Sequence, residues 1–180
     1  MKKTLVLIAG IWMAGTAMVP AAHAQQPYVG VGIGSFSLDP GGNSNAALGA
    51  YLQVGDDFMP YLGGEVRLGA TGSAGNAKMN WFVGAYAKPK FDVTGDLTLY
   101  GLLGLTVART TYTSATTLRS QGKTRADLSY GLGVDYWAGA QYTVGAEWVR
   151  YQSQADTATK NTSFGGLNVD SFVIDAKYHF

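Results

Sequence analysis

The feature that most constrains the fold of this chain is the alternation in its last stretch, residues 170–180. Apolar side chains recur at every second position, namely Phe172, Ile174, Ala176, Tyr178 and Phe180. Ser171, Asp175, Lys177 and His179 fall between them. A period of two places successive side chains on opposite faces, which is the pattern of a β-strand with one apolar face. The chain therefore ends on a strand, and the upstream sequence can be searched for others of the same kind.

Seven upstream segments alternate in the same way and are separated by polar connections rich in Gly, Ser, Thr or Pro. The eight predicted strands cover 28–37, 46–54, 61–70, 79–88, 97–109, 125–137, 142–151 and 170–180. The fifth alternates least cleanly, because Leu102 falls on its polar face. The connections after odd-numbered strands are on the whole the longer ones, above all 110–123 and 152–168. The sequence predicts an all-β fold, an eight-stranded antiparallel up-and-down barrel.

The first predicted strand has a face without side chains. Gly30, Gly32 and Gly34 alternate with Val29, Val31 and Ile33. A glycine stripe normally weakens a strand, so it needs a reason. We expect these glycines to make room in a narrow interior for long side chains from the opposite wall.

The beginning of the chain indicates export. Lys2 and Lys3 precede an apolar run from Leu5 to Ala14, and Ala22-His23-Ala24 fits a small-x-small cleavage rule. We expect a signal peptide at residues 1–24 and one domain at residues 25–180. A retained signal anchor is the alternative, but the run is shorter than the about 20 residues that a membrane-spanning helix needs. The chain has no Cys, so it lacks the disulfides that stabilise many small secreted domains.

Composition limits the possible partners. Charged residues make up 14% of the chain, with a formal net charge of +1. A nucleic-acid partner is not expected, because it would require a concentrated basic face. No segment after residue 24 has the length of an apolar membrane helix, so a membrane location would require a closed barrel.

Aromatic residues on the apolar faces gather near the predicted strand ends. One group is Tyr136, Tyr142, Tyr178 and Phe180, and the other is Trp81, Trp148 and Phe172. Two aromatic girdles around an aliphatic band are typical of a surface that faces lipid. The alternative is a secreted soluble barrel whose apolar face points inward and binds an apolar ligand.

The signal peptide, the eight alternating strands and the terminal Tyr178-His179-Phe180 together resemble a known group of proteins. This is the superfamily of small bacterial outer-membrane β-barrels that includes the OmpA transmembrane domain, OmpX and the opacity proteins. The resemblance implies a monomer in the outer membrane of a Gram-negative bacterium, with periplasmic termini and surrounding lipid and lipopolysaccharide. It also implies that the barrel-assembly machinery recognises Phe180. The sequence ends there, without the peptidoglycan-binding domain of OmpA, so anchoring to the cell wall is not expected.

Charged residues recur on the polar faces of the predicted strands. They are Glu65, Arg67, Lys88, Asp127, Asp135, Glu147, Asp175 and Lys177. Charges inside a barrel just wide enough for side chains are costly unless they pair. We expect an ion-pair network that closes the lumen, with Glu147 and Lys177 as one of its pairs. The alternative is a gated path for ions or small solutes.

Catalysis is not expected. Outer-membrane deacylases, palmitoyltransferases, phospholipases and omptin proteases imply a catalytic His beside a Ser or an acid, near the external face. After residue 24 the only His is His179, close to the other end. Asp56 and Asp57 are adjacent carboxylates in a predicted turn, where solvation is the commoner state. The sequence thus predicts no enzyme, no metal and no cofactor.

Basic residues lie in or beside the longer connections: Lys78, Arg109, Arg119, Lys123, Arg125 and Lys160. Basic side chains at this level can pair with lipopolysaccharide phosphates, although a solvated loop surface is the alternative. Loops on a rigid scaffold are also where binding resides. We expect a non-catalytic protein with a structural, envelope-integrity or adhesin-like surface role, and a small porin is the alternative. The sequence does not name a surface partner.

Overall fold

The computed structural model describes residues 26–39, 44–113, 120–153 and 168–180. These residues form nine strands: β1 (Tyr28–Asp39), β2 (Asn45–Met59), β3 (Leu62–Thr71), β4 (Ser73–Ala74), β5 (Ala77–Asp92), β6 (Leu97–Thr113), β7 (Ser120–Trp137), β8 (Tyr142–Gln152) and β9 (Asn168–His179). β4 continues β3 after Gly72 and pairs with the same neighbour, β5, so the wall counts eight strands. The expected signal peptide, residues 1–24, lies outside the described residues. No helix in the described part of the chain is long and apolar enough to cross a membrane.

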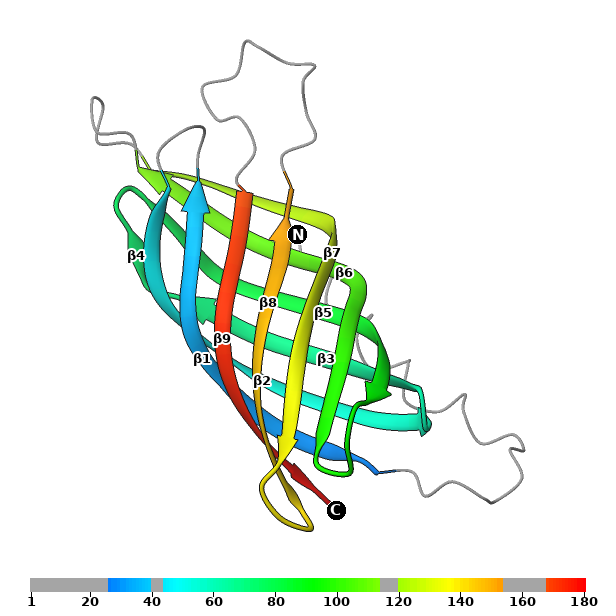
Figure 1. Ribbon diagram of the computed structural model, residues 1–180. Coiled ribbons are helices and arrows are strands. Elements are labelled where there is room, and N and C mark those ends of the chain that lie inside the picture. Colours follow the sequence, from blue (N-terminus) through cyan, green and yellow to red (C-terminus); the bar gives the residue numbers. More distant parts are fainter. Residues whose placement is uncertain (1–25, 40–43, 114–119, 154–167) are drawn as a thin grey trace.

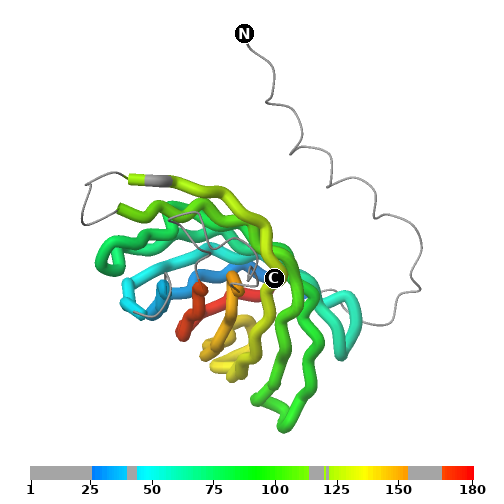
Figure 2. The backbone as a smooth tube through the Cα atoms, turned by 90° about the horizontal axis from the view of Figure 1, so that it is seen from above, coloured from blue at the N-terminus to red at the C-terminus, as the bar shows by residue number. Residues whose placement is uncertain are grey.

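With β3 and β4 counted as one strand of the wall, each strand pairs antiparallel with the next one along the chain, and β1 pairs with β9 to close the barrel. In this closing pair Tyr28 lies opposite His179, and Asp39 lies opposite Asn168. Figure 1 shows the tilted strands, and Figure 2 shows the barrel from above. The predicted eight-stranded antiparallel up-and-down barrel is confirmed. We call the end that carries Tyr28 and Phe180 the terminal end, and the opposite end the loop end.

Several strands are longer than predicted. The turn expected at 55–60 is wrong, since residues 55–57 continue β2 and pair with residues 63–65 of β3. The polar segment 110–123 also contains strand, because β6 runs to Thr113 and β7 begins opposite it at Ser120. Backbone pairing does not require apolar side chains, so strands continue beyond the apolar band. In these outer parts of the strands the sequence is polar and resembles that of a loop.

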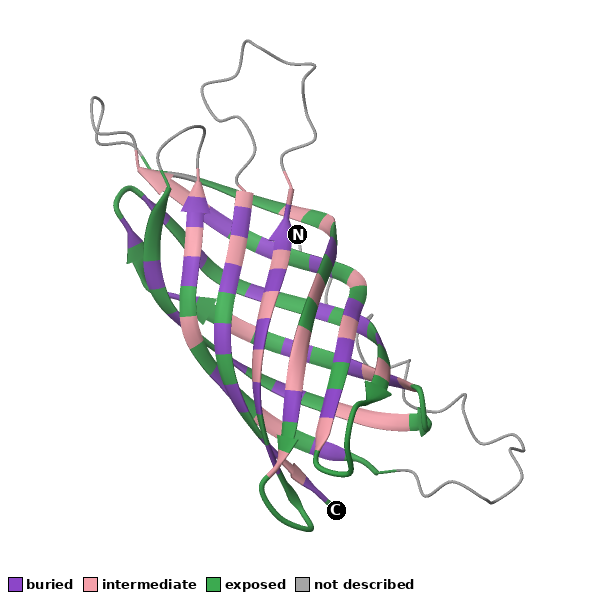
Figure 3. Ribbon diagram, in the orientation of Figure 1, coloured by how far each residue is buried: buried purple, intermediate pink, exposed green. Residues whose placement is uncertain are grey.

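The apolar faces of the strands point outward. Leu48 and Leu132 are 68% and 65% exposed, whereas Arg67 and Glu147 on the opposite faces are 0% and 1% exposed. Figure 3 shows the resulting alternation of buried and exposed residues along each strand. An apolar outside with charges inside is the reverse of a soluble barrel around an apolar ligand. The described residues therefore give that alternative no support.

Of the three glycines predicted to make room for long side chains, Gly32 faces an aromatic ring, whereas a Cβ atom on Gly30 or Gly34 would meet Gln53 or the backbone of Phe172. A Cβ atom on Gly32 would overlap the ring of Tyr51, which lies directly opposite it on the adjacent strand β2. Gly133 of β7 is covered in the same way by Tyr100 of β6. The rings thus come from neighbouring strands and not from the opposite wall. They lie along the wall and carry their hydroxyl groups toward the centre of the lumen.

Candidate functional site

The centre of the lumen is an arginine held between two glutamates. Arg67 of β3 forms a bidentate pair with Glu147 of β8, with distances of 2.5 Å from Nη1 to Oε1 and 2.7 Å from Nη2 to Oε2. Its Nε donates to Glu65 on the same strand. The guanidinium carbon also lies 4.5 Å from the ring centroid of Tyr51. Since β3 and β8 stand four places apart in the eight-stranded wall, this pair spans the lumen.

A second group of charges lies beside the first. Asp135 of β7 accepts from Lys88 Nζ at 3.0 Å and from Lys177 Nζ at 2.5 Å. Lys177 also reaches Asp175, at 2.7 Å, and Lys88 lies 4.0 Å from Glu65. These contacts join seven of the eight predicted lumen charges into one buried network.

The network differs from the prediction in two respects. Glu147 does not pair with Lys177, because Glu147 lies opposite Val173 and Lys177 lies opposite Thr143. Four residues along β9 separate the two levels, or roughly 13 Å of strand. Asp127 does not join this network among the described residues; it pairs with Arg125, at 3.7 Å.

Toward the loop end the interior becomes apolar. The rings of Phe36, Phe82 and Tyr151 are all fully buried, with centroids 4.8 to 6.1 Å apart. Met79, Val149 and Val173 belong to the same cluster. We call this cluster the apolar layer. This cluster was not predicted, although each of the three rings occupies an inward position of the alternation and the sequence therefore carries a signal for it.

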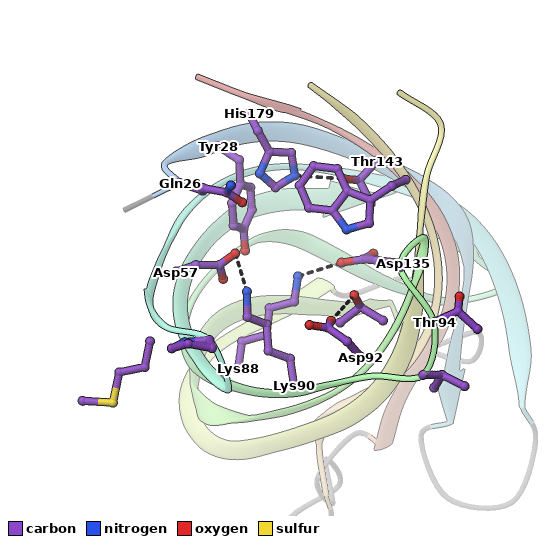
Figure 4. A pocket seen from close by; sticks show the side chains of 16 residues that line it. Gln26, Tyr28, Asp57, Lys88, Lys90, Asp92, Thr94, Asp135, Thr143 and His179 are labelled. Carbon is purple, nitrogen blue, oxygen red and sulfur yellow. Dashed lines mark hydrogen bonds and ion pairs between the residues drawn. The ribbon is translucent and has the colours of Figure 1, made fainter. Parts of the chain in front are cut away.

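The lumen opens into a pocket of about 650 Å³ at the terminal end. Lys88 and Asp135 of the network line it, together with Lys90, Asp57 and His179 (Figure 4). Lys90 pairs with Asp57 at 2.5 Å. The pocket is therefore a vestibule whose lining includes members of the charged network.

The described residues contain no cluster of three or more His, Cys, Asp or Glu side chains that could hold a metal. Asp56 and Asp57 lie in β2, and Asp57 pairs with Lys90. His179 shares a hydrogen bond of 2.9 Å with Thr143, and its ring lies 4.5 Å from that of Trp137.

The six basic residues predicted for the loop end do not form one surface. Lys78 and Arg109 point outward, where Arg109 lies opposite the exposed Trp81. Lys123 and Arg125 occupy the inward face, because they lie opposite the buried Thr110 and Ala108. The remaining two, Arg119 and Lys160, lie outside the described residues.

Most of the predicted aromatic girdle residues gather at two levels of the outer surface. At the terminal end Tyr142 lies opposite Tyr178 with ring centroids 5.3 Å apart, and Tyr178 contacts Phe180. Tyr136 is exposed near the same end, on β7.

Nearer the loop end Trp148 lies opposite Phe172. Two residues further along β8, Arg150 forms an outward ion pair with Asp170 at 2.7 Å. This pair was not predicted from the sequence.

A family model of the outer membrane protein beta-barrel domain matches residues 7–180. The chain belongs to this family. Membership of the outer-membrane β-barrel family identifies the medium around the exposed apolar faces as lipid. A search of curated protein sequences gave no match.

Three solved structures show the same fold. Ail of Yersinia pestis is 17% identical, with 88% of this chain and 100% of that chain covered and a TM-score of 0.61. Neisserial surface protein A is 14% identical, with coverage of 86% and 97% and a TM-score of 0.67. The N-terminal barrel domain of Pseudomonas aeruginosa OprF is 12% identical, with coverage of 87% and 100% and a TM-score of 0.58. At these identities the likeness extends to the fold alone.

Proposed function

We propose that this protein is a sealed, non-catalytic outer-membrane barrel that contributes to envelope integrity and presents its loop end to surface interactions. The observation that carries the proposal is the double closure of the lumen. The Arg67–Glu147 pair spans it, and the apolar layer fills it nearer the loop end. The expected orientation, with the terminal end in the periplasm, places the short turns inside and the longer connections outside.

The two closures oppose ions by different mechanisms. A passing ion would first have to separate Arg67 from Glu147, leaving two buried charges without partners. It would then have to cross the apolar layer, where Phe36, Phe82 and Tyr151 offer three packed rings. A small porin is the second candidate, and the vestibule at the terminal end favours it. That vestibule conducts only if both closures open.

Conductance distinguishes these candidates. Purified protein is inserted into planar bilayers, with a general porin as positive control and gel mobility before and after boiling as the check of folding. We expect folded protein to give no steady single-channel conductance. Steady nonspecific conductance from the folded species would contradict the sealed barrel and make the porin the better assignment.

The absence of catalysis is part of the proposal. His179 is the only histidine in the described part of the chain. Its hydrogen-bonding partner is the hydroxyl of Thr143, and its ring packs near Trp137 and Tyr28. These contacts provide neither the Ser nor the acid that a histidine-dependent hydrolase needs beside its imidazole.

The loop end fits lipopolysaccharide as a surrounding partner. Lys78 and Arg109 project outward from adjacent strands near Trp81, where basic groups can meet phosphates. One of the similar structures is Ail in complex with the heparin analogue sucrose octasulfate, which is also a polyanion. The inward-facing Lys123 and Arg125 are less suited to a lipid partner.

A pair of double variants tests this assignment. Lys78→Glu with Arg109→Glu should remove most of the thermal stabilisation that added lipopolysaccharide gives the protein in detergent micelles. Lys123→Glu with Arg125→Glu reverses the same number of charges on the inward face and should retain that stabilisation. Equal losses in both variants would show that general charge, and not the outward position, governs the effect.

A further inference from the structure

The outer wall of the barrel carries an apolar groove near the terminal end. Its volume is about 480 Å³, which falls within the range of roughly 300–1,000 Å³ that small-molecule sites occupy. Its floor lies on three adjacent strands, since β1 pairs with β2 on one side and with β9 on the other (Figure 1). The groove is separate from the vestibule, because it lies on the outward face of the wall and the vestibule lies inside the barrel.

Short side chains form the floor of the groove, and larger ones form its two sides. The floor consists of Val29, Val31 and Ala176. On the β2 side Leu52 lies opposite Val31 and is 60% exposed. On the other side the rings of Tyr142 and Tyr178 lie 5.3 Å apart. The groove therefore runs between an aliphatic wall and an aromatic wall.

The direction of the groove matches that of a membrane lipid. Along β1 it extends from Val29, close to the terminal end, to Val31, closer to the middle of the wall. Tyrosine rings favour the level of the lipid head groups, because one end of the side chain is apolar and the other is polar. Tyr142 and Tyr178 mark that level at the terminal end. A lipid whose head group lies beside their hydroxyl groups directs its acyl chain along the apolar floor.

The charges at the terminal end favour a head group that carries a cation. Asp56 shares the outward face of β2 with Val54, which lines the groove, and lies two residues closer to the terminal end. Asp56 is partly exposed, and its Oδ1, although covered, has no hydrogen-bond partner among the described residues. An acceptor without a donor is costly, which favours a donor from outside the barrel.

Anionic head groups are matched less well. They are recognised by basic side chains. In the described part of the chain the outward-facing bases lie nearer the loop end, namely Lys78, Arg109 and Arg150. The groove therefore suits a zwitterionic lipid better than an anionic one.

We propose that this groove binds one phospholipid with an ethanolamine head group, taken from the leaflet at the terminal end. The first part of an acyl chain lies over Val31 and Ala176, and the ammonium group lies beside Asp56. The choice of phospholipid rests on the proposed orientation, because the terminal end then lies in the periplasmic leaflet, away from lipopolysaccharide. The test detects bound lipid directly, so it can fail while the sealed, non-catalytic assignment stands.

A second copy of this chain fits the groove less well. A twofold interface brings the same patch of both copies together. Two hollow surfaces would then face each other and leave a void, and the two copies of Asp56 would approach one another. A flexible acyl chain fills such a hollow without either cost.

Native mass spectrometry of the folded protein tests the site. The protein is placed in micelles with equal amounts of ethanolamine and glycerol phospholipids that have the same acyl chains. We expect one phospholipid to remain bound after the detergent is removed. Ala176→Phe fills the floor and should lower this retention roughly tenfold. Ala85→Phe adds the same ring at an exposed outward position of β5, away from the groove, and should keep the lipid. Equal retention by the two variants would overturn the proposal, since lipid would then bind the wall in general.

Leu52→Ala probes the same groove without adding volume. It lowers the aliphatic wall and should weaken lipid retention. Leu103→Ala is the matched control, because Leu103 is 55% exposed on β6 and lies outside the groove. Gel mobility before and after boiling establishes that each variant is folded. If folded Leu52→Ala retains as much lipid as Leu103→Ala, the groove is not the site and the proposal is wrong.

Asp56→Asn tests the head group. It should reduce the preference for ethanolamine over glycerol lipid roughly two- to fivefold, the range of an exposed ion pair. Asp96→Asn removes the same charge from the exposed turn between β5 and β6 and should leave the preference unchanged. The same preference in both variants would contradict the role of Asp56.

Two other outcomes identify a different occupant. Displacement of the bound phospholipid by added lipopolysaccharide would contradict its origin in the periplasmic leaflet. A dimer without bound lipid, lost in Ala176→Phe, would assign the groove to a second copy of the chain. Either result would overturn the proposal.

Discussion

Replacing Arg67 by Met should destabilise the barrel strongly, because it removes the cation from between two buried acids. Glu65 and Glu147 have fully buried side chains. The network holds four acids and three bases, and the variant would hold four acids and two bases. Breaking a buried pair by removing one partner costs about 3–5 kcal/mol of unfolding free energy. We expect a loss in this range. It is partly offset because hydroxyl groups still donate hydrogen bonds to Glu147, such as that of Tyr51 at 2.8 Å.

The double variant Arg67→Met with Glu147→Met separates this explanation from a simple packing defect. It removes the acid left without its bidentate partner, whereas Glu65 keeps the hydroxyl of Tyr28 at 2.6 Å and Lys88 at 4.0 Å. Replacing both partners of a buried pair by apolar residues is often nearly neutral. We therefore expect the double variant to recover most of the loss. The assay is reversible urea unfolding in lipid vesicles, followed by tryptophan fluorescence and gel mobility.

Either of two results would contradict the unpaired-charge explanation of this loss. A cost below about 1 kcal/mol for the single variant would mean that the pair behaves like an exposed one. A double variant no more stable than the single one would mean that the loss comes from packing around the guanidinium and not from unpaired charge.

Two further changes test other parts of the wall. Gly32→Val should cost about 1–3 kcal/mol of unfolding free energy in the same assay, because the new side chain meets the ring of Tyr51. Gly139→Ala should be neutral, because no atom lies within 4 Å of the added Cβ. Equal effects of the two variants would show that backbone propensity outweighs ring placement. Arg150→Ala should cost less than about 1 kcal/mol, since its outward pair is partly exposed, and a larger loss would mean that this pair is part of the folded core.

The sequence could predict which charged residues belong to the candidate site, but not which of them form ion pairs. Alternation alone placed Glu65, Arg67 and Glu147 on the polar faces of their strands, because neighbouring side chains of a strand point to opposite sides. Their partners depend on how β3 and β8 face each other across the closed wall. Strand tilt and stagger set that arrangement, and both are properties of the whole barrel. The expected Glu147–Lys177 pair was wrong for a more local reason, since the register of the adjacent strands β8 and β9 sets Glu147 opposite Val173.

The apolar layer was partly within reach of the sequence. Phe36, Phe82 and Tyr151 all occupy inward positions of the alternation, so the same pattern that placed the charges could have located them. Met79 could not have been located in this way. A register shift between Met79 and Trp81 turns Met79 inward, against the alternation. A bulge depends on the partner strand and leaves no mark in the sequence of one strand.

The sequence by itself determined the number of strands, their antiparallel order and which face of each strand is apolar. These properties follow from a period of two and from short connections, which are local features of the chain. Only the tertiary structure decided which charges pair, where strands end and which face of each strand points inward. Ion pairing across the lumen and strand extension by polar residues both require two distant segments to meet, and their relative position is set by closure of the barrel.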